Sequence, residues 1–330
     1  MKIWIFFHGP IEQDYPEAHE IMRMQEEAQK QKDVSIRVMN PEAIDLMVDS
    51  NGEWKALYEG RILDEMPDVI IPRTGTETGY TGYSVMRFYE RLGVPFLNSP
   101  AVVDMVADKL HTLQVLAAAD IPVPRTMLGK FPPDLDLIEK NLGFPIVIKT
   151  LKGTRGGGVF LSESRDQFKD LVDLLAEANA GAHIIFQKYV QQSHGRDLRV
   201  FVVEGKVLGV MERQSGNTSF KSNISRGGQG KAHAITPEIE KLALAVAQAL
   251  RLEVAGIDLL FDERGFTVCE ANSSPGFTGL EPSCNINAAG AILKAAMHKV
   301  RKNPVGNILQ WMGFKTKRKH QATFDTVKAA

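Results

Sequence analysis

Residues 255–272 carry three side chains whose types and spacing suit metal binding: Asp258, Glu270 and Asn272. A hairpin with a three-residue turn at residues 263–265, with glycine in the left-handed position, places Asp258 opposite Glu270. Side chains that face each other across an antiparallel pair lie about 4.5–5.5 Å apart at Cβ. Asn272 projects from the same face as Glu270, because side chains alternate along a strand. We therefore expect three oxygen donors on one face of the hairpin.

The rest of this hairpin face is expected to be largely apolar. The same register places Leu260 opposite Val268 and Asp262 opposite Phe266. Two opposed carboxylates repel each other unless a positive charge lies between them. A divalent cation supplies that charge, and oxygen ligands of this kind suit Mg²⁺ or Mn²⁺. Two alternatives stay open: a solvated face that binds no metal, and a two-residue turn that shifts the register by one.

A glycine-rich segment, Gly-Thr-Arg-Gly-Gly-Gly at residues 153–158, lies between apolar segments at residues 145–150 and 159–162. Glycines let backbone N–H groups approach phosphate oxygens closely. The segment lacks the Gly-Lys-Ser/Thr of a Walker A loop, and it does not open a helix as a dinucleotide fingerprint does. It is consistent with a loop that covers phosphates or with a flexible hairpin turn.

Three cations stand where they could bind a phosphate or a carboxylate. Lys149 ends an apolar strand, and because a buried ammonium without a partner is costly, we expect a nucleotide phosphate or an internal carboxylate beside it. Lys109 lies in the first turn of an expected helix. Arg226 precedes two glycines, where its guanidinium could meet a phosphoryl or carboxyl group. A mobile surface loop is the alternative for Arg226.

Short apolar segments alternate with helical patterns in the first part of the chain. Strands are expected at residues 2–7, 34–39 and 68–72, and helices at residues 17–31 and 84–92. This alternation predicts a small α/β unit with a parallel sheet.

Arg73 directly follows the strand expected at residues 68–72. In α/β sheets, ligands bind beyond the carboxyl ends of the strands. We therefore expect Arg73 to bind a substrate carboxylate. A salt bridge at the start of a helix is the alternative.

The remaining elements must position the hairpin and the cations. The sequence predicts helices at residues 104–119, 166–178, 237–250 and 288–302, strands at residues 145–150, 159–162 and 184–190, two strands within residues 197–214, and the hairpin at residues 254–272. Thr236 is expected to be the N-cap of the helix at residues 237–250, which has proline in its first turn.

Length and composition limit the classes of function. The chain has 330 residues, of which 44% are hydrophobic and 24% charged, enough for two or three domains with packed cores. A net charge of −1 gives no reason to expect direct nucleic-acid binding. The basic cluster at residues 315–320 is expected to be a solvated tail, and it is also compatible with a macromolecular acceptor.

Cysteine usage and hydropathy bear on location. The two cysteines, Cys269 and Cys284, do not form a disulfide framework or a zinc-site pattern, which favours a reducing, cytoplasmic location. No apolar run is long enough for a membrane span, so no membrane partner is expected.

Taken in order, these segments resemble the ATP-grasp superfamily and, within it, the RimK-type α-L-glutamate ligases. The resemblance covers roughly residues 98–300, and the N-terminal part fits the family's pre-ATP-grasp domain more loosely. It rests on the order and spacing of short motifs: Asp108-Lys109-Leu110, Val147-Ile148-Lys149, Gly153-Thr154-Arg155-Gly156-Gly157-Gly158-Val159, Gln187-Lys188-Tyr189-Val190, Gly195-Arg196-Asp197-Leu198-Arg199, Phe220-Lys221-Ser222-Asn223, Arg226-Gly227-Gly228, Ala255-Gly256-Ile257-Asp258 and Glu270-Ala271-Asn272-Ser273-Ser274-Pro275-Gly276.

The resemblance implies an α/β (α+β) chain in which the ATP-grasp fold follows an N-terminal pre-ATP-grasp α/β domain. The implied boundaries are residues 1–98 for the pre-ATP-grasp domain, 99–190 for the small (lid) subdomain with the glycine loop, 191–304 for the subdomain with the metal site, and 305–330 for a C-terminal tail.

The family pattern also implies a role for each matched residue. Arg226 and Arg199 would face the acyl phosphate as catalytic residues. Two Mg²⁺ or Mn²⁺ ions would be bound by Asp258, Glu270 and Asn272, with Glu270 bridging them. ATP would contact Lys109, Lys149, Gly153, Thr154, Gly156, Gly157, Gly158, Gln187, Lys188, Tyr189, Val190, Asp197, Lys221, Ser222 and Asn223. Within that set, Gln187 to Val190 would hold the adenine by backbone groups and Asp197 would take the ribose. The family usually has arginine where Lys221 stands.

By this resemblance, the chain is expected to be an ATP-dependent carboxylate–amine ligase that forms an amide through an acyl phosphate and releases ADP and phosphate. Its expected partners are L-glutamate or another amino acid, and a carboxylate- or amine-bearing acceptor such as a small molecule, a cofactor, a peptide or a protein tail. A homo-oligomer is expected. Two alternatives are an ATP-grasp-type small-molecule kinase and a nucleotide-binding protein without catalysis. The complete metal-binding set argues against the second.

Overall fold

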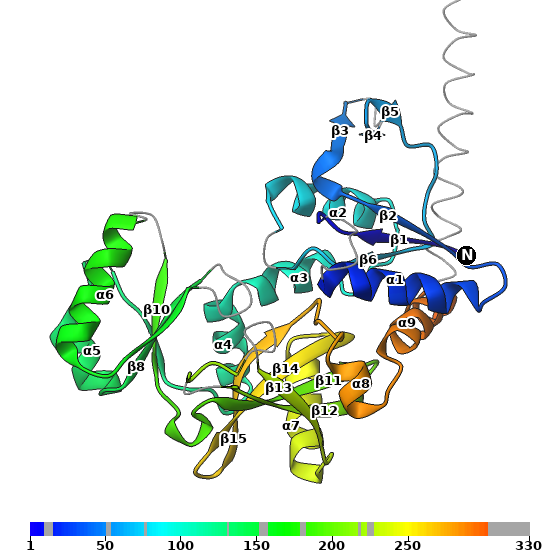
Figure 1. Ribbon diagram of the computed structural model, residues 1–330. Coiled ribbons are helices and arrows are strands. Elements are labelled where there is room, and N and C mark those ends of the chain that lie inside the picture. Colours follow the sequence, from blue (N-terminus) through cyan, green and yellow to red (C-terminus); the bar gives the residue numbers. More distant parts are fainter. Residues whose placement is uncertain are drawn as a thin grey trace, which may run out of the picture. The chain divides into compact units, whose positions relative to one another are not determined.

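The computed structural model describes residues 1–9, 16–50, 54–75, 78–130, 132–151, 158–178, 183–216, 219–222 and 228–302 (Figure 1). Backbone contacts divide the chain into two compact units. One contains Met1–Thr74, Thr78–Pro100 and Ala289–Ala330, and the other contains Gly75–Glu77 and Ala101–Ala288. None of the described helices is long and apolar enough to cross a membrane.

The first unit is built on a parallel sheet, as predicted. Its strands run in the order β2 (Ser35–Met39), β1 (Lys2–Phe6), β6 (Val69–Pro72). Two helices of this unit are α1 (Pro16–Gln29) and α2 (Tyr80–Arg91). Four consecutive residues of β1, from Ile3 to Phe6, are fully or almost fully buried. This continuous burial is typical of a parallel strand covered on both faces.

A second, antiparallel sheet in the first unit was not predicted. It consists of β3 (Ile44–Val48), β4 (Trp54–Tyr58) and β5 (Arg61–Ile62), in that order. Trp54 stacks on Phe88 of α2, with 5.6 Å between the ring centroids. Each strand spans five residues or fewer, so the alternation of apolar and polar residues is too short to separate a strand from a loop in the sequence.

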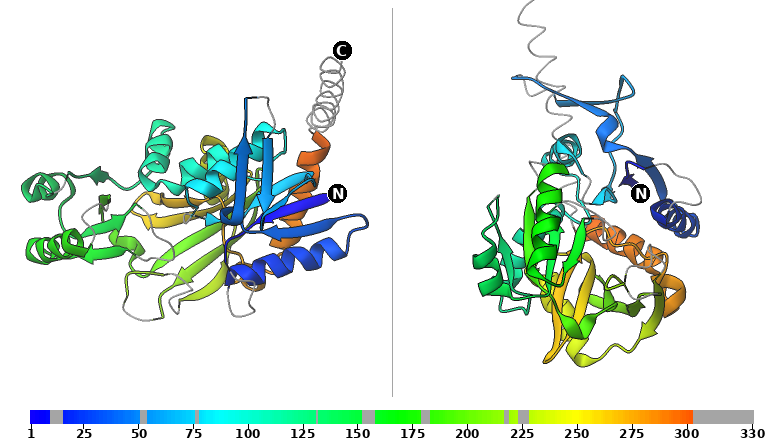
Figure 2. Two further views of the ribbon diagram at one scale, coloured as in Figure 1. Left: turned by 90° about the horizontal axis from the view of Figure 1, so that it is seen from above. Right: turned by 60° about the vertical axis from the view of Figure 1, so that its left-hand side comes forward.

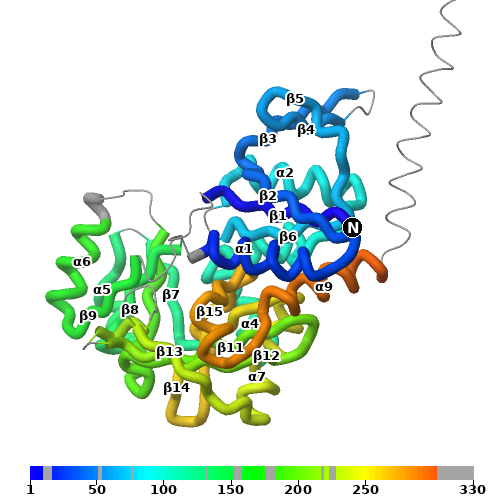
Figure 3. The backbone as a smooth tube through the Cα atoms, turned by 45° about the vertical axis from the view of Figure 1, so that its right-hand side comes forward, coloured from blue at the N-terminus to red at the C-terminus, as the bar shows by residue number. Residues whose placement is uncertain are grey.

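The second unit contains a four-stranded antiparallel sheet in the order β7 (Thr126–Leu128), β10 (Ile184–Lys188), β8 (Ile146–Thr150), β9 (Val159–Ser162). Helices α5 (Leu135–Leu142) and α6 (Arg165–Ala178) cover one face of this sheet (Figures 1 and 3). Their buried side chains share a core with Ile146 and Ile148. Because side chains alternate along β8, Lys149 belongs to the opposite face.

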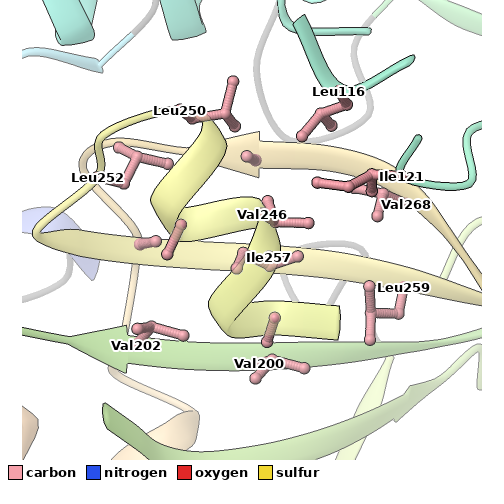
Figure 4. Close-up of a cluster of buried hydrophobic side chains, with 14 of the residues drawn as sticks. Leu116, Ile121, Val200, Val202, Val246, Leu250, Leu252, Ile257, Leu259 and Val268 are labelled. Atoms are coloured by element: carbon pink, nitrogen blue, oxygen red, sulfur yellow. The ribbon is translucent and has the colours of Figure 1, made fainter. Parts of the chain in front are cut away.

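The same unit contains a five-stranded antiparallel sheet in the order β13 (Gln229–His233), β12 (Lys206–Gln214), β11 (Arg196–Val203), β14 (Val254–Asp262), β15 (Gly265–Asn272). The strands run side by side from green to orange in Figure 2. One face packs against α7 (Pro237–Ala249), where Val246 meets Val200 and Ile257 in one apolar cluster (Figure 4). The polar residues of these strands therefore belong to the other face.

Helix boundaries explain two further positions. Thr236 caps α7 as predicted, and its hydroxyl accepts a hydrogen bond from the Ile239 N–H. The single helix expected at residues 104–119 is wrong, because the chain forms α3 (Pro100–Ala107) and α4 (Lys109–Ala118) instead. Asp108 separates them: its carboxylate accepts hydrogen bonds from two N–H groups of α4 and so begins a new helix. Two more helices follow β15, α8 (Leu280–Cys284) and α9 (Ala288–Lys302).

The predicted β14–β15 register is right at the site and wrong beyond it. Asp258 pairs with Glu270 as expected, but Asp262 pairs with Gly265 across a two-residue turn. Leu260 therefore faces Thr267 rather than Val268, and Phe266 faces Phe261 rather than Asp262.

A β-bulge reconciles the two parts of this hairpin. The register shifts between Asp258 and Leu259, where β15 has one extra residue, Cys269. The extra residue cancels the one-residue shift of the shorter turn. It also sends Val268 into the apolar core with Leu259, so Val268 does not line the carboxylate face as the sequence interpretation had it.

Candidate active site

Charged side chains form a row across four strands of the five-stranded sheet. The register places Arg213 of β12 opposite Asp197 of β11, and Arg199 of β11 opposite Asp258 of β14. Glu270 of β15 continues the row, because it pairs with Asp258. Residues that share a face and are directly opposed come within contact distance. The topology thus gathers residues that lie far apart in the sequence.

Arg199 and Arg213 both contact the Asp258 carboxylate. Arg199 donates from Nη2 to Oδ2 at 2.9 Å and from Nε to Oδ1. The Nη2 of Arg213 lies 2.8 Å from the same Oδ2. Arg213 also holds Asp197 at two points, with 2.7 Å from Nε to Oδ1 and 2.6 Å from Nη2 to Oδ2. Such forked arginine–carboxylate pairs fix geometry more tightly than single contacts.

The electrostatics of this row keep Asp258 and Arg213 charged. Burial by itself would raise the pKa of Asp258, but the guanidinium groups of Arg199 and Arg213 outweigh it and lower the pKa to about 2. Burial alone would lower the pKa of Arg213, and the carboxylates of Asp258 and Asp197 raise it well above its usual value instead. Each buried charge has an opposite partner, which offsets much of its desolvation cost.

Glu270 and Asn272 have oxygens that can still accept a ligand. Glu270 is half-buried and makes no hydrogen bond or ion pair within the described part of the chain. Asn272 donates from Nδ2 to the Gly256 carbonyl at 3.4 Å, so its Oδ1 faces elsewhere. No group of three His, Cys, Asp or Glu side chains among the described residues is arranged as a metal site. The expected set contains only two such side chains, because Asn272 is an amide.

This donor set fits Mg²⁺. Two opposed carboxylates and an amide oxygen are the ligands that a hard divalent cation prefers. Glu270, directly opposite Asp258, has no ion pair among the residues described, and the charge of Lys109 acts on it. Asp258, Glu270 and Asn272 are therefore the residues that would hold the ion.

Two lysines lie near this row. Lys149 is buried, and its Nζ lies 3.6 Å from Cys269 Sγ, which brings the four-stranded sheet against the bulge of β15. Lys149 has no ion-pair partner in the described ranges, so the internal carboxylate considered as its alternative partner is not seen there. Lys109 donates from Nζ to the Leu151 carbonyl at 3.0 Å. Burial lowers the pKa of Lys109, and the charge of Glu270 opposes that shift.

The segment expected to hold adenine lies at the end of β10. Gln187 is buried and donates from Nε2 to Thr126 Oγ1 at 2.9 Å, which leaves its side chain engaged within the sheet. The Lys188 N–H donates to the Arg125 carbonyl at 2.9 Å. A pocket of about 380 Å³ lies beside the segment, lined by Val123, Pro124, Arg125, Lys188, Tyr189, Val190, Gln191, Gln192, Asp262, Glu263, Arg264 and Thr267. It contains three of the four expected adenine contacts and neither opposed carboxylate.

Lys221 and Ser222 are two further residues that are expected to contact the nucleotide and that the structure describes. The Lys221 ammonium lies 5.6 Å from the Phe220 ring centroid and 5.7 Å from that of Phe160 on β9. Ser222 is buried. Gly158 adopts φ 67°, and a Cβ there would lie 2.2 Å from Thr150 Oγ1, so only glycine fits. The other predicted positions lie outside the described residues: Gly153, Thr154, Gly156, Gly157, Asn223, Arg226 and the cluster at residues 315–320.

Arg73, expected to bind a substrate carboxylate, is buried in the first unit. Its guanidinium forms an ion pair with Glu20 of α1, whose side chain is equally buried. The internal salt bridge considered as its alternative is therefore present, although the partner comes from α1 rather than from a helix that Arg73 begins. A role for Arg73 in substrate binding stays a prediction.

Sequence reasoning missed Arg213, because a second bulge hides it. The β11–β12 turn at residues 204–205, without irregularity, would have placed Glu212 opposite Asp197. The register instead shifts between Phe201 and Val202, where β12 has the extra residue Leu208, and Arg213 takes the position opposite Asp197. The only available signal was chemical: two carboxylates facing each other there would have been unfavourable.

Comparisons with known proteins show the family of this chain. A family model described as "RimK-like ATP-grasp domain" matches residues 106–296, and one described as "RimK PreATP-grasp domain" matches residues 1–103. The chain belongs to the RimK-like ATP-grasp family. Together the two matches cover nearly all the described residues, which confirms the predicted ATP-grasp fold and its pre-ATP-grasp domain.

Curated relatives of this family are similar along most of the chain. A "Probable alpha-L-glutamate ligase 1" from Shewanella amazonensis is 35% identical over 307 residues, which are 92% of this chain and 98% of that protein. A "Ribosomal protein bS6--L-glutamate ligase" from Escherichia coli is 37% identical over 238 residues, which are 72% of this chain and 78% of that protein. The chain is thus an ATP-grasp ligase, and such ligases use ATP and Mg²⁺.

A solved structure supports the fold independently. It is described as "ATP-grasp ligase PsnB complexed with phosphomimetic variant of minimal precursor, Mg, and ADP", and it superposes with a TM-score of 0.67 over 90% of this chain and 98% of the other. The two sequences are only 18% identical, so the likeness establishes the architecture and leaves the substrate open.

Proposed function

We propose that this RimK-like ligase adds L-glutamate to the carboxylate at the end of a protein or peptide, through an acyl phosphate, with release of ADP and phosphate. The observation that carries the proposal is the directly opposed pair Asp258–Glu270, which lies on one face with two arginines and near two lysines. The names of the relatives supply glutamate as the added amino acid and a protein or peptide as the acceptor.

The lysines provide charge for the nucleotide phosphates. Lys149 has a buried ammonium with only a thiol beside it among the described residues, and a phosphate oxygen is its natural partner. Lys109 reaches the same region from the start of α4. Backbone groups of Gln187 to Val190 hold the adenine, and Asp197 takes the ribose hydroxyls.

Asp258, Glu270 and Asn272 would hold two divalent ions, and Mn²⁺ would suit the same oxygen ligands as Mg²⁺. When bound there, Mg²⁺ neutralises charge on the β- and γ-phosphates during phosphoryl transfer. The acceptor carboxylate attacks the γ-phosphorus, ADP leaves, and the product is an acyl phosphate, a mixed anhydride that is reactive enough for attack by an amine.

Arg199 and Arg226 serve the acyl phosphate. Arg199 contacts Asp258, one of the expected metal ligands. From there its guanidinium can move to a phosphoryl oxygen. Arg226 stabilises the oxyanion formed when the glutamate amine attacks. The role proposed for the glycine-rich segment at residues 153–158 is to keep water from hydrolysing the intermediate. Lys221, Ser222 and Asn223 line the nucleotide.

The proposal is tested by incubating the protein with ATP, Mg²⁺, L-glutamate and peptides that differ only in their C-terminal residue. A peptide product heavier by one or more glutamate residues, formed with equal amounts of ADP, supports the proposal. A product heavier by a phosphate, formed without any amine, would instead identify a kinase. Replacing glutamate by each other amino acid then tests the identity of the added residue.

A trapping experiment isolates the first half of the reaction. With hydroxylamine in place of glutamate, an acyl phosphate gives a peptide hydroxamate that mass spectrometry detects. Hydroxamate that depends on ATP and on the peptide carboxylate supports activation of the acceptor. If hydroxamate forms on glutamate in a parallel reaction that contains glutamate and hydroxylamine but no peptide, the direction of the proposed reaction is wrong.

A further inference from the structure

Arg213 of β12 contacts two carboxylates, Asp197, which is expected to bind the ribose, and Asp258, which is expected to bind metal. Its side chain is 7% exposed and contacts both Asp197 and Asp258. A single nitrogen, Nη2, lies 2.6 Å from Asp197 Oδ2 and 2.8 Å from Asp258 Oδ2. Because the guanidinium is planar and rigid, a shift of one carboxylate must tilt the plane and disturb the other.

The two arginines of the row are held differently. Arg199 contacts Asp258 alone among the described acidic residues, whereas Arg213 contacts Asp258 and Asp197 together. If Arg199 leaves Asp258 for a phosphoryl group, Arg213 still fixes Oδ2. The other oxygen, Oδ1, then loses its contact with Arg199, and Glu270 lies directly opposite Asp258 on the neighbouring strand.

We infer that Arg213 is a positioning residue that couples the ribose site to the metal site. By fixing Asp258 Oδ2 it leaves Oδ1 for the cation, and by holding Asp197 at two points it orients the remaining lone pairs toward the ribose hydroxyls. The inference rests on the proposed roles of Asp197 in ribose binding and of Asp258 in metal binding. Arg213 itself touches neither the nucleotide nor the ion.

The coupling predicts that one substitution affects two ligands. In Arg213→Lys the charge is kept, but a compact ammonium cannot contact both carboxylates in the forked geometry. Removing a partner that orients a metal ligand costs about 10–100-fold in metal affinity. The dissociation constant for Mn²⁺, measured by electron paramagnetic resonance with saturating ADP, is therefore expected to rise about tenfold or more.

The ribose effect is measured with ADP analogues that lack one ribose hydroxyl. Calorimetry without metal gives the ratio of the dissociation constants of analogue and ADP for each protein. The wild-type protein is expected to prefer ADP clearly, and Arg213→Lys is expected to lose most of that preference. A purely structural role would lower thermal stability but leave this ratio unchanged. Arg91→Gln, an exposed position at the end of α2, serves as the matched control.

Each outcome has a separate meaning. Weaker Mn²⁺ binding together with loss of ribose discrimination in Arg213→Lys supports the coupling. Wild-type values for both quantities, or a change in only one, overturn it. If the wild-type protein itself binds neither ADP nor Mn²⁺, the proposed function fails rather than the coupling. Arg213→Gln adds a harsher test, and Arg213→Lys decides the matter if Arg213→Gln does not fold.

Discussion

Arg199 and Asp258 lie directly opposite each other on β11 and β14 and form a two-point ion pair. A residue expected to meet the acyl phosphate is thus bonded to a residue expected to bind metal. A cation that takes Asp258 must share this carboxylate with Arg199 or displace it. Displacement would release a guanidinium at the place where phosphoryl charge develops, so metal binding and arginine availability are linked.

Arg199→Lys is expected to lower kcat while the KM for ATP changes little. A preorganised cation aimed at developing charge contributes about 10²–10³ in rate, and lysine replaces its fork by a single point charge. Steady-state kinetics at saturating Mg²⁺ measure both constants. A rise in KM for ATP as large as the fall in kcat would place Arg199 in nucleotide binding instead.

Glu270→Gln should abolish turnover while the protein remains folded. The substitution keeps the shape of the side chain and removes the negative charge that the metal requires. Glu240→Gln, at an exposed position on α7, is the matched control and is expected to keep full activity. Turnover and circular dichroism are measured for both variants. Near-normal turnover in Glu270→Gln would remove the metal assignment.

Lys149→Met is expected to weaken ATP binding without lowering the melting temperature. The variant replaces a buried ammonium, which has no ion-pair partner within the described ranges, by an apolar side chain of similar length. A hydrogen bond to a charged group contributes about 1.5–3 kcal/mol, so the dissociation constant for ATP should rise about tenfold or more. Unchanged ATP affinity with a lower melting temperature would make Lys149 a structural residue.

Arg73 and Glu20 allow a test that separates structure from substrate binding. Arg73→Met alone leaves a buried carboxylate unpaired and should cost about 3–5 kcal/mol of stability. The double variant Arg73→Met with Glu20→Met should recover most of that loss. Activity that returns with stability indicates a structural pair. Activity that stays low in the stable double variant, with a raised KM for the acceptor, indicates substrate binding.

Thr236→Ala tests the capping of α7 and, with it, the support of the five-stranded sheet. Loss of an N-cap side chain costs about 1 kcal/mol. Denaturant unfolding should show that decrease with unchanged kcat, since Thr236 lies on the helix that packs behind the charged row. A large loss of activity at unchanged stability would contradict this separation.

The ATP-grasp fold was predicted from the family resemblance that the order of the motifs carries, whereas apolar periodicity predicted individual strands and helices and the parallel sheet of the first unit. The opposed pair Asp258–Glu270 was also predicted, but from a three-residue turn that does not exist. The turn is one residue shorter than predicted, which shifts the register by one residue, and the bulge at Cys269 shifts it back. The sequence pattern shows well how apolar and polar residues alternate along a strand. A bulge interrupts this alternation at a single residue, and nothing in the sequence marks that residue.

Arg213 and the Arg73–Glu20 pair show what the sequence could not provide. Both depend on which side chains a register or a helix places together, and Arg213, Arg73 and Glu20 lie in none of the motifs that carry the resemblance. Lys149 was placed correctly on an apolar strand, yet its contact with Cys269 joins residues 120 positions apart. Such contacts follow from the packing of separate sheets, which short motifs do not encode.

The most direct test of the proposed ligase reaction follows oxygen from the acceptor to phosphate. A peptide whose C-terminal carboxylate carries ¹⁸O at both oxygens is incubated with ATP, Mg²⁺ and L-glutamate, and the released phosphate is analysed by mass spectrometry. An acyl phosphate on the acceptor predicts one ¹⁸O atom in each phosphate, because the amide retains only one of the two carboxylate oxygens. Phosphate without ¹⁸O, released together with a glutamylated peptide, would contradict activation of the acceptor carboxylate.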